Sequence, residues 1–128
     1  MVSYDTFFGK SGGCRNVMVC KDVKKINKML LDKNAALKSH NYIILDRTKY
    51  RKTVAEIGIT KKDVLDDIKE LDINDTWECK EDDNMDFPGE VWITKKILYG
   101  KKIYIKIKIK EDVDNMLLVM SYHFDGMN

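Results

Sequence analysis

Cysteine, histidine and proline are scarce in this chain of 128 residues, which has three Cys, two His and one Pro. The cysteines, Cys14, Cys20 and Cys79, are odd in number and form no C-x-x-C pair. A disulfide framework or a closed Cys/His zinc site would need more ligands at regular spacing. We therefore expect inert thiols, and neither a metal nor another cofactor.

Long apolar runs and common catalytic motifs are also missing. No stretch of about 18 apolar residues is present, so we expect no membrane span. Residues 1–10 lack the basic-then-apolar order of a secretory signal, which favours a cytoplasmic location. The absence of a Gly-rich phosphate loop, of G-x-S-x-G and of H-E-x-x-H excludes four chemistries as first choices: P-loop nucleotide hydrolysis, dinucleotide oxidoreduction, serine-hydrolase chemistry and zinc-protease chemistry.

The chain is rich in charge, and the charges are segregated. Hydrophobic residues make up 44% and charged residues 34%, which predicts a single globular domain over residues 1–128. Residues 72–90 hold eight acidic residues and one base, Lys80, whereas residues 92–110 hold seven lysines and no acidic residue. The acidic segment has no apolar period and contains Pro88, so we expect a long loop. The basic segment is typical of a polyanion-binding surface, although lysines also protect edge strands and solvate exposed faces.

Apolar spacing divides the chain into a helical part and a strand part. Asp22, Thr48 and Thr60 can each begin a helix, and the apolar residues after them recur at helical spacing. Strand patterns dominate after residue 90, where short connections predict a three-stranded antiparallel meander. The expected fold class is therefore α+β, with about three helices packed on one face of the sheet. The expected helices cover residues 22–34, 48–58 and 60–71, and the expected strands cover 17–19, 42–46, 91–99, 102–110 and 116–123, while residues 1–20 are otherwise uncertain.

In the predicted strand over residues 102–110, isoleucine alternates with lysine or tyrosine at every position. Its isoleucines point to one side, which must meet the helices, and its lysines and Tyr104 point to the other. Grouping like charges on one face lowers stability, which suggests that a polyanion binds there. His123 is the last residue of the predicted strand 116–123. Regular alternation places Ser121, Val119 and Leu117 on the same face as His123. A lone histidine is, however, more often structural than catalytic.

RNA cleavage by internal transfer needs only side chains of these types. A base takes the 2′-hydroxyl proton, cations stabilise the phosphorane, and an acid protonates the leaving 5′-oxygen. Only RNA carries the 2′-hydroxyl nucleophile. Tyr104, His123 and the lysines supply these groups. Trp92 and Tyr99 are candidates for stacking on unpaired bases, although Trp92 also fits a core position.

Five segments together resemble one known family. They are YIILDR at residues 42–47, AEIGIT at 55–60, PGEVW at 88–92, GKKIYIK at 100–106 and SYH at 121–123. In this order, over roughly residues 22–123, they resemble the motility quorum-sensing regulator (MqsR) family of bacterial toxins. The resemblance implies a RelE-like fold, with a curved antiparallel sheet and helices on one side. It also implies a metal-independent endoribonuclease that cuts single-stranded mRNA and is neutralised by a cognate antitoxin protein.

The resemblance also assigns residues. The family's tyrosine falls on Tyr104, its basic C-terminal-strand position falls on His123, and Lys80 is the nearest counterpart of its lysine. Candidate catalytic residues are therefore Tyr104, His123, Lys106 and Lys96, and candidate RNA-binding residues are Lys80, Lys102, Lys108, Lys110, Arg47 and Trp92.

A non-catalytic function stays open as the alternative. It would be a toxin-fold protein that only binds, such as a phage- or plasmid-borne, anti-CRISPR-like inhibitor of a nucleic-acid-guided nuclease, or a regulator that sequesters RNA. Two features favour it. The acidic segment 72–90 can mimic nucleic acid or dock a basic protein partner, and Ile93 stands where the family has a polar residue, with Thr94 or Lys96 as its replacement. A third possibility is a toxin relic that retains only the fold and antitoxin binding.

Overall fold

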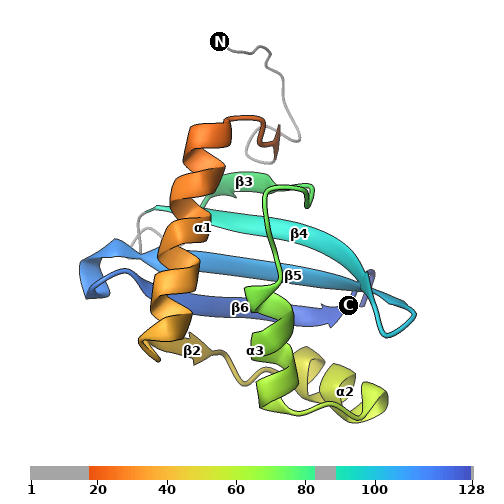
Figure 1. The fold of residues 1–128 in the computed structure, drawn as a ribbon. Coiled ribbons are helices and arrows are strands. Elements are labelled where there is room, and N and C mark those ends of the chain that lie inside the picture. The colour runs from red at the N-terminus through yellow and green to blue at the C-terminus, as the bar shows by residue number, and fades with distance from the viewer. Residues whose placement is uncertain (1–17, 83–88, 128) are drawn as a thin grey trace.

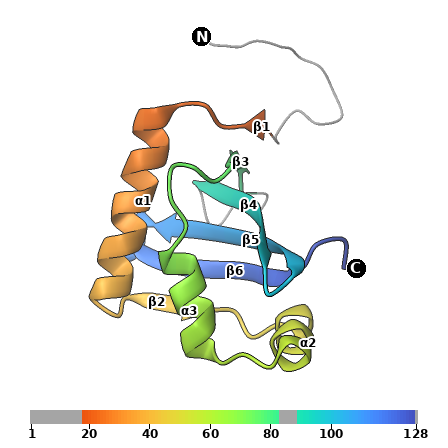
Figure 2. The ribbon, with the colours of Figure 1, turned by 45° about the vertical axis from the view of Figure 1, so that its right-hand side comes forward.

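The computed structural model describes residues 18–82 and 89–127. Within these residues, three α-helices pack on one side of a six-stranded sheet (Figure 1 and Figure 2). The prediction of an α+β fold with helices on one side is confirmed. In chain order the elements are β1 (Met18–Val19), α1 (Val23–Lys38), β2 (Tyr42–Ile44), α2 (Thr48–Ile57), α3 (Lys61–Lys69), β3 (Glu78–Glu81), β4 (Glu90–Leu98), β5 (Lys101–Lys110), a 3₁₀ turn (Glu111–Val113) and β6 (Met116–Phe124).

The sheet is mixed, with the strand order β1-β3-β4-β5-β6-β2. The predicted antiparallel meander is β4–β5–β6, and β2 joins β6 in parallel. Strand β3 lies inside residues 72–90, where the sequence predicts a loop, and pairs Cys79 with Trp92 of β4. The loop prediction is therefore wrong for β3, whose hydrogen bonds come from a distant strand, and residues 83–88 lie outside the described part.

Helix boundaries follow local capping chemistry. The Asp22 side chain accepts a hydrogen bond from a main-chain N–H in the first turn of α1. Thr60 and Asp63 form a capping box at the start of α3. Gly58, with φ at +83°, ends α2 in the left-handed region that favours glycine. These predicted boundaries are confirmed. Helix α1, however, continues to residue 38 and does not end near residue 34 as predicted.

A buried lysine holds the second half of α1 in place. Lys33 is 0% exposed, and its Nζ donates hydrogen bonds to the carbonyl oxygens of Ile68, Lys69 and Leu71 at 2.9, 3.2 and 2.6 Å. These carbonyls lie at the end of α3, where helical partners run out. Ala36 is also buried, so α1 remains packed on the core beyond its predicted end.

The hydrophobic core lies between the helices and the middle of the sheet. Ile103, Ile105 and Ile107 of β5 are fully buried, as their alternation predicts. Trp77, which directly precedes β3, and Tyr122 of β6 pack into the same core. Among the described helices, none has the length and apolar character needed to cross a membrane.

One carboxylate joins α3 to two strands. Asp67 accepts hydrogen bonds from the hydroxyls of Tyr99 and Tyr122 at 2.9 and 2.8 Å. Tyr99 lies at the tip of the β4–β5 hairpin, and Tyr122 is fully buried. Burial and the bond to Asp67 raise the pKa of Tyr99 to about 12 and also raise that of Tyr122. Both phenols therefore stay protonated and donate to Asp67.

Replacing Asp67 with alanine is expected to lower the free energy of unfolding by about 2 kcal/mol, because the buried Tyr122 hydroxyl loses its acceptor. Urea denaturation measures this change. The control is Asp66→Ala, which removes an exposed carboxylate one residue away and should change stability by less than about 0.5 kcal/mol. Equal effects of the two substitutions would contradict the role assigned to Asp67.

Candidate nucleic-acid interface

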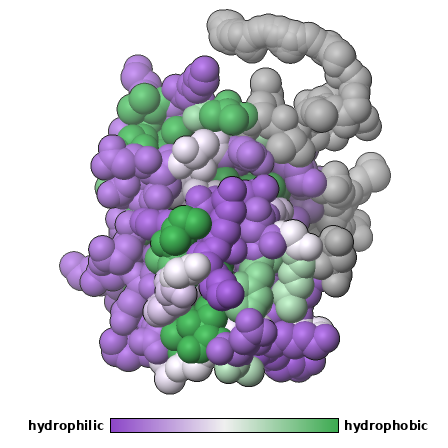
Figure 3. Space-filling model, turned by 90° about the vertical axis from the view of Figure 1, so that its right-hand side faces the viewer, coloured by the Kyte–Doolittle hydropathy of each residue, from purple (hydrophilic) through white to green (hydrophobic). Residues whose placement is uncertain are grey.

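Strand β5 presents a row of cations on the side of the sheet opposite the buried isoleucines. This side of β5 carries Lys102, Tyr104, Lys106, Lys108 and Lys110, and we call it the lysine face. The end of the sheet where the β4–β5 hairpin turns is mainly hydrophilic, with small apolar patches (Figure 3). The arrangement suits a polar, negatively charged ligand.

A β-bulge in β6 determines which of its side chains join the lysine face. Ser121 pairs with Lys106, while Val119 pairs with the next residue of β5, so Met120 is an extra residue. His123 and Ser121 therefore lie on the lysine face, and Val119 lies on the core side, where it is 1% exposed. The prediction that Val119 and Leu117 share a face with His123 is wrong, because the bulge shifts the alternation by one residue.

Tyr104 and His123 form the central contact of this face. The two residues pair across β5 and β6, and their rings stack with centroids 5.1 Å apart and an interplanar angle of 15°. Nδ1 of His123 lies 2.9 Å from the main-chain oxygen of Phe124. A carbonyl oxygen can only accept, so Nδ1 carries the proton, and Nε2 of the neutral imidazole is the atom that can take one up.

The Tyr104 phenol is a donor at neutral pH. Tyr104 is half-buried, and this burial raises its pKa above the ordinary value of 10.0, with further contributions from the negative charges of Glu78 and Asp125. A phenol that keeps its proton, stacked on an imidazole whose Nε2 can accept one, places a proton donor beside a proton acceptor, which is the pairing that general acid–base catalysis requires.

Lys95 is a cation of this site that the sequence analysis missed. It pairs with Tyr104 across β4 and β5, and its Nζ lies 3.3 Å from Asp125 Oδ1. The turn of the hairpin is at Tyr99 and Gly100, both with positive φ, and this turn aligns residue 95 with residue 104. The predicted strands, 91–99 and 102–110, put the turn one residue later, at residues 100–101, and so do not pair residue 95 with residue 104.

The lysines of the predicted RNA-binding set differ in their availability. Lys108 is 2% exposed, and its Nζ lies 2.7 Å from Asp82 Oδ2, so the prediction that it contacts RNA is wrong for this arrangement. Lys80, Lys106 and Lys110 are half-buried and each already interacts with another group. Phosphate binding at these lysines would therefore exchange one interaction for another. Lys102 is exposed.

Lys96 and Trp92 are on the opposite side of the sheet. Lys96 pairs in register with Ile103, faces the helices, and has its Nζ 3.4 Å from Asp75 Oδ1. Trp92 is 5% exposed and packs edge-to-face on Trp77, with ring centroids 6.3 Å apart. The catalytic role predicted for Lys96 and the stacking role predicted for Trp92 are therefore wrong, because even-numbered residues of β4 face the core.

In the family that the sequence resembles, a polar residue falls at position 93. Neither of its predicted replacements, Thr94 or Lys96, lies on the lysine face. Ile93 itself pairs with Lys106 there, but it is buried. Thr94 is 1% exposed on the core side, and its hydroxyl donates to the main-chain oxygen of Thr76 at 2.8 Å. Residues 93, 94 and 96 therefore add no available polar group to the lysine face.

Two neighbouring hollows lie along the lysine face beside β6. The larger, of about 540 Å³, is lined by Ile43, Leu45, Arg47, Lys80, Asp82, Val91, Lys106, Lys108, Lys110, Met116, Leu118 and Met120. The smaller, of about 290 Å³, is lined by Arg47, Thr48, Lys49, Tyr50, Met120, Ser121, Tyr122 and His123. Both include Arg47 and Met120, so the hollows adjoin. Their described lining residues include six Lys or Arg and one acid, Asp82.

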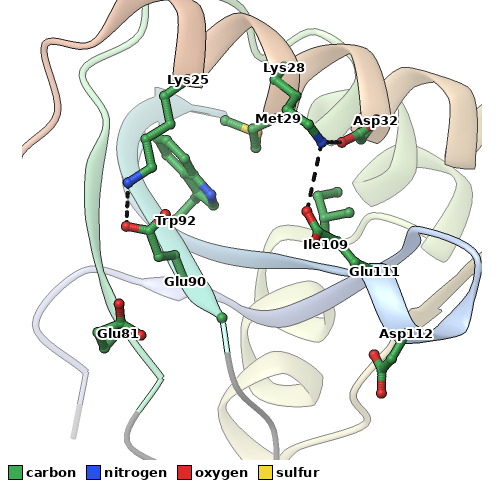
Figure 4. Close-up of a pocket in the computed structure, with 11 residues that line it drawn as sticks. Lys25, Lys28, Met29, Asp32, Glu81, Glu90, Trp92, Ile109, Glu111 and Asp112 are labelled. Atoms are coloured by element: carbon green, nitrogen blue, oxygen red, sulfur yellow. Dashed lines mark hydrogen bonds and ion pairs between the residues drawn. The ribbon is translucent and has the colours of Figure 1, made fainter.

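A third hollow, on the helix side, has the opposite charge. It has a volume of about 600 Å³, and its described lining includes five carboxylates and two lysines. Lys25 extends along Trp92 to pair with Glu90, and Lys28 lies between Asp32 and Glu111 at 3.0 and 3.7 Å (Figure 4). Both lysines are thus already paired, which leaves this hollow net negative.

No protein-family model, curated protein or solved structure matches the chain. The function is therefore inferred from the geometry of the hollows and of the Tyr104–His123 pair. Within residues 18–82 and 89–127, no three His, Cys, Asp or Glu side chains gather as a metal site would require.

Proposed function

We propose that the chain is a metal-independent endoribonuclease of a toxin–antitoxin system, with a RelE-like fold, that cleaves single-stranded mRNA in the cytoplasm. The observation that supports this proposal is the stack of Tyr104 on His123 on the lysine face, with Nδ1 of the imidazole held by a main-chain carbonyl. A cognate antitoxin would be its protein partner.

The proposed reaction uses only side chains of this chain. Nε2 of His123 takes the proton of a ribose 2′-hydroxyl, and the 2′-oxygen attacks the adjacent phosphorus. The bond from phosphorus to the 5′-oxygen breaks, leaving a 2′,3′-cyclic phosphate, and the 5′-oxygen takes the proton of Tyr104. An alkoxide is a stronger base than a phenolate, so a phenol with a raised pKa still gives up its proton. Lys95 and Lys106, which pair in register with Tyr104 and Ser121, would stabilise the phosphorane charge.

Purified protein is expected to cleave unstructured RNA in the presence of EDTA and to leave 2′,3′-cyclic phosphate ends, because no step requires a metal. Gel analysis of end-labelled RNA, with phosphatase treatment to identify the ends, measures this. Intact RNA after long incubation with stoichiometric protein would overturn the proposal, and cleavage that leaves 3′-hydroxyl ends would overturn the mechanism.

The net-negative hollow favours a second candidate function, in which the protein only binds. Its rim carboxylates, Glu81 and Asp112, are exposed, and its floor includes Met29 and Ile109, so it fits a basic segment of a protein partner. Failure to cleave RNA, together with salt-sensitive binding of a basic protein that Glu81→Ala weakens, would favour this candidate. Tight, salt-dependent RNA binding without cleavage would instead indicate an RNA-sequestering regulator.

A further inference from the structure

The two hollows of the lysine face meet at Arg47, at the junction of β2 with α2. Arg47 is the N-cap residue of α2, and its side chain makes no capping hydrogen bond. It is exposed, and its guanidinium has neither a hydrogen bond nor an ion pair with any residue of the described part. Arg51, one turn later, is instead 3.4 Å from Asp46. The positive charge at the junction is therefore available to a ligand.

The smaller hollow brings this charge next to His123. Lys49 adds a second cation that has no ion pair among the described residues, and Ser121 adds a hydroxyl. Tyr50 lines the same hollow as a half-buried aromatic ring, and burial raises its pKa, so the ring is neutral. Cations that bind phosphate, together with a neutral aromatic ring on which a base can stack, form a single-strand binding site.

We infer that the smaller hollow is the subsite for the nucleotide next to the scissile phosphate, with Arg47 and Lys49 binding its phosphate and the strand continuing into the larger hollow. This inference rests on the proposed function. The RNA strand would then follow β6 and β2, and it would meet β5 only at the lysines that line the larger hollow, not at Lys102.

The test is the binding of a short single-stranded RNA in which every ribose is 2′-O-methylated, because this probe lacks the nucleophile and cannot be cleaved. Arg47→Ala is expected to weaken binding about 10-fold at low salt and to reduce the slope of log K against log salt by about 0.7, the loss of one phosphate contact. Lys49→Ala should act in the same direction, and Arg47→Lys should restore part of the loss.

The matched control is Lys24→Ala, which removes an exposed cation of α1 that lines neither hollow and lies on the helix side of the sheet. It should change binding less than about 2-fold, as expected for a distant surface charge in salt. Equal effects of Arg47→Ala and Lys24→Ala, or no binding of the probe by the unmodified protein, would overturn the inference. Because the probe cannot react, a failure of RNA cleavage would reject the proposed function without changing this result.

Discussion

RNA cleavage is expected to slow by about 10²-fold or more when His123 is replaced by alanine, because the proposed base, which stacks on Tyr104, is removed. The hydrogen bond from Nδ1 to the main-chain oxygen of Phe124 keeps the proton on that nitrogen, so the lone pair that can accept a proton is on Nε2. Single-turnover kinetics with saturating protein would measure the loss in the chemical step. Binding of the methylated probe should change little.

The control for this substitution is His40→Ala, which removes the other histidine of the chain. His40 is exposed, has φ at +59°, and lies between α1 and β2. Tyr104→Phe completes the set, since it keeps the ring that stacks on His123 and removes only the hydroxyl. Equal rates for His123→Ala and His40→Ala would exclude the imidazole as the base. A full rate for Tyr104→Phe would exclude the phenol as the acid.

Replacing Lys33 with methionine is expected to lower the free energy of unfolding by about 3 kcal/mol. Methionine keeps most of the aliphatic stem in the core, but carbonyl oxygens at the end of α3 lose their donor. Urea denaturation at neutral pH measures the loss. The matched control is Lys24→Met, on the exposed side of α1, which should stay within about 0.5 kcal/mol of the original protein.

The contribution of Lys33 should also depend on pH. Burial lowers its pKa in the folded protein to about 8, from an ordinary value of 10.5. Between these values the unfolded state binds more protons than the folded state, so stability rises with pH in this window. Relative to Lys33→Met, the original protein should gain up to about 3 kcal/mol of stability as the pH rises from 8 to 10.5, and it should lose that gain as the pH falls from 10.5 to 8. A constant difference between the two proteins would contradict burial of the charge.

Features that depend on neighbours in sequence were predictable. The caps at Asp22 and Thr60 and the glycine end at Gly58 follow from chemistry within one helical turn. The alternation of residues 102–110 places Tyr104 and the isoleucines on opposite faces, because one side must be buried. These signals predict the helix starts, the meander and the face of β5 on which Tyr104 lies.

Features that depend on distant partners were not predictable. Residues 78–81 form a strand only because β4 lies beside them, and β4 itself has apolar residues on both faces, so periodicity does not show which side Lys96 takes. The bulge at Met120, which brings His123 onto the lysine face, leaves no mark in the local pattern. Arg47 and Lys49 join the site through the packing of α2 on β6.

The position of β6 between β5 and β2 has a consequence for synthesis on the ribosome. Strand β2 is synthesised early, but it pairs with β6, which is the last strand of the sheet in chain order. The nascent chain therefore cannot form the β2–β6 edge of the sheet until residues 116–124 have left the exit tunnel. Helices α1 and α2 pack on β6, so their apolar sides stay exposed, and accessible to chaperones, until residues 116–124 emerge. Under the proposed function, a nascent chain would therefore have no complete catalytic site, and the transcript being translated would be spared, until residues 116–124 have emerged.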